Sequence, residues 1–191
     1  MTASRANLLM EIPLIDTNMR LFIAVNFNRE TNNSLLTLRD ELRSGAEHGS
    51  FTLSDNLHIT LAFLGECNAK QAFAAKTVMD SVSFKPFDIL VERVGRFGGA
   101  EGEALWWAGV SVDETLSDLH RILTDKLVAA GFKLDSRKFS PHITLGRRVV
   151  TDAVPRRITP FGETVHKIDL MKSERINGKL TYTAIHKRIS C

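Results

Sequence analysis

His58-Ile59-Thr60-Leu61 is a tetrapeptide that this chain contains twice, because the same four residues return 84 positions later as His142-Ile143-Thr144-Leu145. Isoleucine and threonine are β-branched, so each copy predicts a strand. Side chains alternate between the two faces of a strand, and the histidine and threonine therefore share one face while the isoleucine and leucine share the other. We expect two strands that each pack an apolar face into a core and present an imidazole beside a hydroxyl on the opposite face.

The segments that precede the two tetrapeptides indicate an internal duplication. Each half begins with an apolar strand and continues into a helix with regularly spaced leucines: strands at 21–25 and 105–110, and helices with apolar positions over 35–42 and 116–127, ending near Gly45 or Gly49 and at Gly131. The offset of 84 also carries Leu21, Phe22 and Ala24 onto Leu105, Trp106 and Ala108. We therefore predict a bilobal α+β fold, in which two pseudo-symmetric antiparallel sheets backed by helices bring the tetrapeptide strands together at a central cleft.

The remaining segments add further elements to this plan. They are a helix over about 69–82, a strand at 87–94, a hairpin connection through the glycines of 95–102, a loop with Pro155 and Pro160, and strands at 163–172 and 180–189 joined by a turn at Asn177-Gly178. The last two strands are expected to complete the second sheet. Residues 1–18 are predicted to form a disordered N-terminal extension or to follow from an upstream start, and residues 19–189 a single bilobal domain.

The composition excludes several classes of protein. With 43% hydrophobic and 25% charged residues, the chain resembles an ordinary globular protein, and its net charge of +3 permits an anionic partner without indicating a nucleic-acid wrap. Cys67 and Cys191 have no spacing typical of a zinc site or a disulfide framework, which favours a reducing cytoplasm. No apolar run approaches the roughly 18 residues of a membrane helix, and we identify no targeting signal.

The face that carries His58, Thr60, His142 and Thr144 indicates phosphoester chemistry. Two His–Thr pairs that face each other across a cleft supply an acid, a base and two hydroxyl donors for a charged transition state. Imidazole can hold either proton-transfer role near neutral pH, so spacing alone leaves the two roles unassigned.

Five blocks of sequence resemble the 2H phosphoesterase superfamily, and in particular the RNA 2′,3′-cyclic phosphodiesterases, also called 2′-5′ RNA ligases. The blocks lie in the order of the family, at 19–25, 56–65, 105–110, 139–145 and 170–173 with Tyr182. The resemblance implies hydrolysis of a 2′,3′-cyclic phosphate at an RNA end to a 2′-phosphate, with reversible 2′-5′ ligation left open. It also implies catalysis without a metal or a nucleotide cofactor. Apart from the resemblance, we expect a monomer without a membrane partner.

The same resemblance assigns roles to five residues of this chain. It makes His58 the proton donor and His142 the proton acceptor, and it places Thr60, Thr144 and Arg147 on the substrate phosphate. Strict alternation puts Arg147 on the face opposite His142 and leaves Arg148 on the histidine face. A β-bulge at Gly146 would bring Arg147 to the phosphate.

Two other functions are compatible with the same residues. The cleft could belong to a module that binds a nucleotide or an RNA end, or to a phosphodiesterase of a small cyclic nucleotide. Trp106 and Trp107 are adjacent, so at least one is expected in the core while the other could stack on a base. Cys67 and the remaining histidines lack any partner motif and are expected to be ordinary structural residues: His48, His120, His166 and His186.

Overall fold

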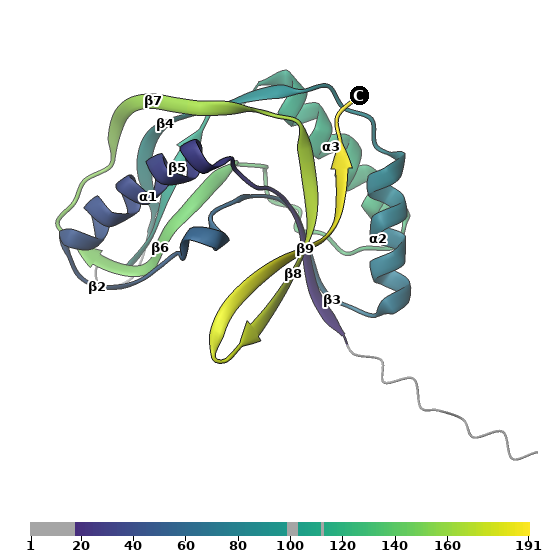
Figure 1. Cartoon of the computed structure of the whole chain (residues 1–191), viewed down its shortest axis with the longest axis horizontal. Coiled ribbons are helices and arrows are strands. Elements are labelled where there is room, and N and C mark those ends of the chain that lie inside the picture. The colour runs from purple at the N-terminus through teal and green to yellow at the C-terminus, as the bar shows by residue number, and fades with distance from the viewer. Residues whose placement is uncertain (1–17, 99–102, 112) are drawn as a thin grey trace, which may run out of the picture.

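The computed structural model describes residues 18–98, 103–111 and 113–191, which form nine strands, three helices and one 3-10 turn (Figure 1). The elements in chain order are β1 (Met19–Val25), α1 (Arg29–Ser44), β2 (Ala46–Phe51), η1 (Ser54–Asn56), β3 (Ile59–Cys67), α2 (Ala69–Ser81), β4 (Phe87–Phe97), β5 (Ala104–Val110), α3 (Glu114–Ala129), β6 (His142–Thr151), β7 (Arg156–Val165), β8 (Lys167–Ile176) and β9 (Lys179–Ile189).

The sheet order is symmetric about the two tetrapeptide strands. Eight strands run in the order β7-β4-β5-β6-β3-β1-β8-β9, β2 pairs with β6, and all the pairings are antiparallel. β3 and β6 meet at the centre through the pair Ile59–Ile143, so the two copies of the tetrapeptide lie next to each other. The α+β class and the central position of both tetrapeptides are confirmed. The two expected sheets are the two halves of one sheet, joined by this single pair.

The strand register limits how far the repeat of 84 residues extends. Thr60 pairs with Ala24, whereas Thr144 pairs with Trp107 and not with Ala108. β1 and β5 therefore correspond at an offset of 83 residues, although β3 and β6 correspond at 84. The sequence match of Leu21, Phe22 and Ala24 to β5 is one residue out of structural register, and that part of the predicted repeat was wrong.

The helices link the two halves of the sheet. α1 follows β1, yet it packs on strands of the other half: the Asn28 backbone N–H that precedes it donates to the Glu163 carboxylate of β7 at 3.0 Å, and Glu41 pairs with Arg156 of β7 at 2.6 Å. α3 follows β5 and instead lies beside α2, against β3 (Figure 1). One continuous apolar core runs beneath both halves.

Local sequence sets the ends of α1 and α2. Asn28 caps α1 by accepting from the Thr31 N–H, and Gly45 is its C-cap residue. Asn68 and Gln71 form a reciprocal capping box at the start of α2. Side-chain acceptors at these N-termini satisfy N–H groups that a helix leaves free.

The C-terminal third differs most from the prediction. The strand expected at 163–172 is divided between β7 and β8, and Pro160 lies inside β7, an edge strand that can tolerate a residue without an N–H. β7 pairs with β4 and completes the second half, but β8 and β9 extend from β1 and complete the first. Placing both predicted strands in the second sheet was therefore wrong.

The structure covers only parts of two predicted segments, the N-terminal extension and the hairpin connection. Residues 1–17 of the predicted extension and residues 99–102 of the hairpin connection lie outside the described residues. Asn177 and Gly178 form the expected turn between β8 and β9, and both have positive φ. In the described part of the chain, no helix is long and apolar enough to cross a membrane.

Candidate active site

The five predicted site residues line one cleft between the two halves of the sheet. The cleft has a volume of about 550 Å³, and β3 and β6 supply its floor. Its walls come from β1, from the segment 50–56 and from the hairpin of β8 and β9, which projects from the body of the molecule (Figure 1). The lining residues are Arg20, Phe22, Ser50, Phe51, Thr52, Leu53, Asn56, His58, Thr60, Phe63, His142, Thr144, Arg147, Ser173, Arg175, Lys179, Leu180 and Tyr182.

Hydrogen bonds fix the tautomer of His58. Its Nδ1 lies 2.7 Å from the carbonyl oxygen of Asn56, which can only accept, so Nδ1 carries a proton. Its Nε2 lies 3.0 Å from Oγ1 of Thr60. In the neutral imidazole, Nε2 therefore accepts from the Thr60 hydroxyl, and Nε2 is the nitrogen left for proton transfer in the cleft.

His142 is held in the same way. Its Nδ1 donates to the carbonyl oxygen of Ser140 at 2.7 Å, two residues upstream, as His58 does to Asn56. The backbone therefore holds both imidazoles through Nδ1, and Nε2 of each ring makes no bond to these carbonyls. The Phe97 ring contacts His142 edge to face, with ring centroids 5.2 Å apart.

His58 sits in an aromatic and electropositive environment. Phe22 lies 4.9 Å from its ring and Tyr182 5.4 Å, measured between centroids. Burial lowers the pKa of His58 below its ordinary value of 6.5, and the positive charges of Arg147 and His142 lower it further, against an opposing contribution from the Asn56 carbonyl. Arg147 and His142 both belong to β6, and they line the same cleft as His58.

Irregular pairing in β6 determines which arginine enters the cleft. Thr144 pairs with Trp107 and Gly146 with Trp106, so Leu145 is an extra residue that changes the faces of the following side chains. Arg147 consequently joins His142 and Thr144 in the cleft lining. The bulge was predicted at Gly146, and the structure has it one residue earlier, at Leu145. Arg148 adopts a left-handed backbone conformation with φ of 51° and is not among the lining residues.

The cleft is strongly cationic. Arg20, Arg147, Arg175 and Lys179 line it, and none of the described lining residues is an aspartate or glutamate. Guanidinium and ammonium groups bind phosphate through charge-assisted hydrogen bonds. The site is therefore suited to an anion near the two imidazoles and to further negative charge along the hairpin.

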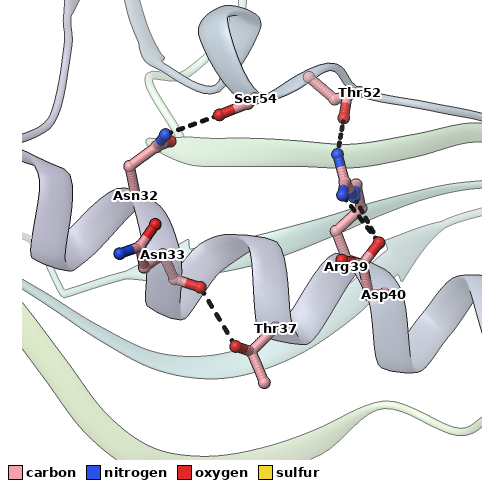
Figure 2. A network of polar contacts seen from close by, with 7 residues as sticks. All are labelled: Asn32, Asn33, Thr37, Arg39, Asp40, Thr52 and Ser54. Atoms are coloured by element: carbon pink, nitrogen blue, oxygen red, sulfur yellow. Dashed lines mark hydrogen bonds and ion pairs between the residues drawn. The ribbon is translucent and has the colours of Figure 1, made fainter.

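Polar contacts hold the 50–56 wall against α1 (Figure 2). Arg39 donates to the carbonyl of Thr52 at 2.9 Å, and Asn32 donates to the Ser54 hydroxyl at 3.0 Å. On the opposite side, the buried Asn56 amide donates to the carbonyl of Leu180 in β9 at 2.9 Å. Because the Asn56 carbonyl also anchors His58, these contacts connect α1 and β9 to the orientation of an active-site imidazole.

Thirteen of the 18 lining residues were absent from the site predicted from the sequence, among them Arg20, Phe22, Phe63 and Tyr182. Arg20 and Phe22 are two residues apart in β1, so strand alternation places them on one face. Once β1 is known to pair with β3, this alternation predicts that both side chains lie near the cleft. Phe63 stands 84 residues before Arg147, and the repeat contains a signal for it. Tyr182 was noted only as part of the family resemblance.

The structural roles expected for other residues are mostly observed. Trp106 is buried, with 1% of its side chain exposed, and Trp107 lies outside the cleft lining with its ring over the Arg93 guanidinium. Cys67 is buried, and burial raises the pKa of its thiol. Among the described residues, no group of three or more His, Cys, Asp and Glu side chains could hold a metal ion.

Comparison with known proteins places this architecture in a family. The model of the 2′-5′ RNA ligase superfamily matches residues 37–177. The chain belongs to the 2′-5′ RNA ligase superfamily. An RNA 2′,3′-cyclic phosphodiesterase of Archaeoglobus fulgidus is 34% identical over 129 residues, covering 68% of this chain and 72% of the relative.

Two further proteins are similar to this chain, one of them longer and the other of known structure. An RNA 2′,3′-cyclic phosphodiesterase of Geobacillus stearothermophilus is 31% identical over 173 residues, which is 84% of this chain, and the match spans only 53% of that relative. The crystal structure of E. coli LigT complexed with 3′-AMP superposes with a TM-score of 0.77 at 23% identity, covering 91% of this chain and 98% of LigT. The fold described above is therefore the fold of LigT.

Proposed function

We propose that this protein hydrolyses the 2′,3′-cyclic phosphate at an RNA end to a 2′-phosphomonoester, with two histidines and no metal ion. The observation that carries the proposal is the matched anchoring of His58 and His142, each through Nδ1 to a carbonyl two residues upstream, in a cationic cleft. The relatives named RNA 2′,3′-cyclic phosphodiesterase support the choice of substrate.

In the proposed reaction, Nε2 of neutral His142 takes a proton from water as the water oxygen attacks phosphorus. The bond between phosphorus and O3′ breaks, and Nε2–H of protonated His58 donates its proton to the departing oxygen. The Thr60 and Thr144 hydroxyls and the Arg147 guanidinium bind the remaining phosphate oxygens, where negative charge increases in the transition state. A 5′-hydroxyl in place of water would give a 2′-5′ linkage by the same proton transfers.

The lowered pKa of His58 has a consequence for the proposed acid. A general acid with a low pKa gives up its proton readily, but in the free protein only a minor fraction is protonated at neutral pH. An anionic substrate between the imidazoles opposes the charge of Arg147 and favours the protonated form of His58. Substrate binding and acid activation are thereby linked in this mechanism.

Alanine variants of the two histidines test the proposal. Loss of general acid or base assistance costs ~10²–10⁴ in rate, so His58→Ala and His142→Ala should each lose about that factor on an RNA with a 2′,3′-cyclic phosphate end. The product assay resolves 2′-phosphate from 3′-phosphate. A nitrophenyl phosphodiester, whose leaving group needs little protonation, should rescue His58→Ala far more than His142→Ala.

Three results would contradict parts of this scheme. Rescue of His142→Ala in place of His58→Ala would show that the two roles are reversed. Full activity in both variants would show that the reaction is not a two-histidine hydrolysis. Tight binding of the RNA end without any product from the wild-type protein would identify a binding module.

A further inference from the structure

An aromatic cluster extends the histidine face of the sheet beyond β6. β5 and β4 follow β6 on the side away from β3, and Trp107 of β5 pairs with Thr144 of β6 and with Gly95 of β4. Paired residues point to the same face of a sheet, as do residues two positions apart in one strand, so Trp107 and Phe97 share the face of Thr144. The cluster therefore lies on the surface that carries the two imidazoles, on the outer side of His142.

Contacts between the side chains hold this cluster in place. The six-membered ring of the Trp107 indole lies over Gly95 and Gly109, where a Cβ on either glycine would collide with it. The guanidinium carbon of Arg93 lies 5.7 Å from the centroid of the Trp107 ring, and the Phe97 ring lies 5.2 Å from the same indole at an interplanar angle of 38°. The glycines thus let the indole approach the sheet closely, and the indole supports the phenyl and guanidinium groups on either side of it.

Phe97 is exposed and also contacts the proposed proton acceptor. It is 42% exposed, and its ring lies 5.2 Å from the His142 imidazole, nearly perpendicular to it at 88°. Phe97 is not among the described residues that line the central cleft, so the phosphate between the two imidazoles does not account for it. An exposed ring held between an indole and an imidazole is available to stack on a planar group that extends from the cleft past His142.

The proposed chemistry determines what extends in that direction. His58 in β3 protonates O3′, so the ribose that carries the cyclic phosphate lies toward β3, and the nucleophile that His142 deprotonates enters from the side of β6. A water molecule needs no further contact there. A nucleophile that is the 5′-hydroxyl of an RNA carries its nucleoside away from phosphorus across β5 to β4, two interstrand spacings or about 10 Å, which is the scale of a nucleoside.

We propose that Phe97, supported by Trp107, stacks on the first base of an acceptor RNA whose 5′-hydroxyl attacks the cyclic phosphate, and that Arg93 binds the phosphate that follows this nucleoside. This inference rests on the proposed function, because the roles of the two histidines define the side from which the acceptor enters. In this step O5′ forms a bond to phosphorus as the bond between phosphorus and O3′ breaks. The proton of O5′ moves to Nε2 of His142, and the proton on Nε2 of His58 moves to O3′, which leaves a 2′-5′ phosphodiester beside a free 3′-hydroxyl.

The partition of one substrate between two products tests this inference. An RNA with a 2′,3′-cyclic phosphate end is incubated with a 5′-hydroxyl RNA acceptor below saturation, and the ligated 2′-5′ product and the hydrolysed 2′-phosphate are quantified in the same reaction. The acid, the base and the phosphate-binding groups serve both products, so their ratio reports the binding of the acceptor. Stacking of one base on an aromatic side chain contributes ~1–3 kcal/mol, so Phe97→Ala should lower the ratio of ligated to hydrolysed product roughly 5- to 150-fold. Phe97→Trp should retain the ratio.

Matched acceptors and a surface variant serve as controls. Methyl riboside offers the same primary hydroxyl without a base, so Phe97→Ala should leave its ratio of O5′-linked to hydrolysed product unchanged. Arg93→Gln should lower the ratio for an acceptor that carries a 3′-phosphodiester but not for adenosine, which has no phosphate. Phe73 of α2 is 73% exposed and does not line the cleft, so Phe73→Ala should leave every ratio unchanged.

Failure of the acceptor site and failure of the proposed function give different results. Equal loss of both products in Phe97→Ala, with an unchanged ratio, would show that Phe97 only supports His142 and would overturn the inference. Hydrolysis by the wild type without any ligated product would also overturn it, and the proposed hydrolysis would stand. Absence of both products would refute the proposed function and the acceptor site together.

Discussion

Leu145 is the residue at which β6 changes the face to which its side chains point. Before it, His142 and Thr144 face the cleft in regular alternation, and after it the odd-numbered Arg147 does so. Leu61 has the same place in β3, where it precedes Phe63. An extra residue in each central strand therefore brings a side chain onto the histidine face, which regular alternation would direct away from it.

The two adjacent arginines should respond differently to substitution. Arg147→Ala removes a proposed phosphate-binding group from the cleft and should lower kcat/KM by about 10- to 150-fold, since a hydrogen bond to a charged group contributes ~1.5–3 kcal/mol. Arg148→Ala keeps a Cβ at the same left-handed position and should leave kcat/KM near the wild-type value. Steady-state kinetics on a cyclic nucleotide measure kcat/KM for both variants. A loss in Arg148→Ala with near wild-type activity in Arg147→Ala would place Arg148 on the phosphate.

Arg147 also provides a test of which histidine is the acid. The pH dependence of kcat/KM reports the ionisations of the free enzyme, and the proposed mechanism needs His58 protonated and His142 neutral. The charge of Arg147 contributes to the lowered pKa of His58, so Arg147→Ala should raise that pKa. The alkaline limb of the profile should then move to higher pH. Movement of the acidic limb in its place would make His58 the base.

Activity should survive the removal of metal ions, because two imidazoles already supply the acid and the base. Hydrolysis of a cyclic phosphate is measured in excess EDTA and after addition of divalent ions. Turnover is expected to be the same in both. Loss of activity in EDTA and its recovery with one divalent ion would show that the nucleophile is a metal-bound water, and not a water that His142 deprotonates.

The sequence contained most of the information needed to find the central residues of the cleft. Strand alternation and the repeated tetrapeptide identified His58, Thr60, His142 and Thr144, and all four line the same cleft. Their catalytic roles stay predictions. The side walls were missed because Arg20 and Tyr182 reach the cleft only through the pairing of β1 with β3 and of β8 with β1, and no local pattern encodes which strands become neighbours.

At the scale of elements, α1 connects the core to the cleft wall. Its Arg39 is largely buried and bonds the Thr52 carbonyl, while the neighbouring Asp40 is exposed and pairs only with Arg39 in the contacts described (Figure 2). Arg39→Ala leaves a carbonyl at the edge of the wall without its charged donor. Asp40→Ala removes a surface ion pair between adjacent residues but keeps the bond to Thr52.

We expect unequal losses of stability from these two substitutions. Arg39→Ala should lower the free energy of unfolding by ~1–3 kcal/mol, and Asp40→Ala by less than about 1 kcal/mol. Urea denaturation followed by circular dichroism measures both. Arg39→Ala should in addition reduce kcat/KM, because the 50–56 segment leads into the Asn56 carbonyl that orients His58. Equal effects of the two substitutions would show that the ion pair, and not the bond to Thr52, stabilises the wall.

Local patterns predicted elements with a clear apolar period and missed elements that depend on their neighbours. The ends of α1, α2 and α3 agree with their caps and glycines to within a few residues. β2 (Ala46–Phe51) was not predicted, since this mostly polar edge strand forms by pairing with β6. β8 and β9 were assigned to the wrong half because two antiparallel strands fit either edge of a sheet equally well by their own periodicity.

At the scale of the whole molecule, the two halves cannot separate without breaking the core. α1 begins in the first half of the sequence and packs on β7, and α3 begins in the second half and packs near β3. The single pair between Ile59 and Ile143 is therefore only a small part of what joins the two halves of the sheet. The shared core places His58 and His142 on adjacent strands of one body.

The protein contains two histidines whose burial should make its stability depend on pH. Burial lowers the pKa of His58 and of His120 below 6.5, and the ring of His120 stacks on Phe139 at a centroid distance of 3.8 Å. The unfolded chain then binds more protons than the folded protein as the pH falls below 6.5. Stability due to these groups is complete above 6.5 and decreases progressively below it.

The free energy of unfolding should accordingly be lower near about pH 5.5 than near about pH 7.5, before most carboxylates begin to titrate. Urea denaturation at the two pH values measures the difference, and His120→Phe supplies the decisive comparison because it keeps the aromatic stack on Phe139 while removing a titrating group. The difference between the free energies of unfolding at the two pH values should be smaller in His120→Phe than in the wild type. It should be smaller still when His58→Asn is added. At the higher pH, differences in stability between the variants reflect packing alone. A wild-type protein that becomes more stable toward pH 5.5 would contradict the expectation that the lowered pKa values of His58 and His120 control stability in this range.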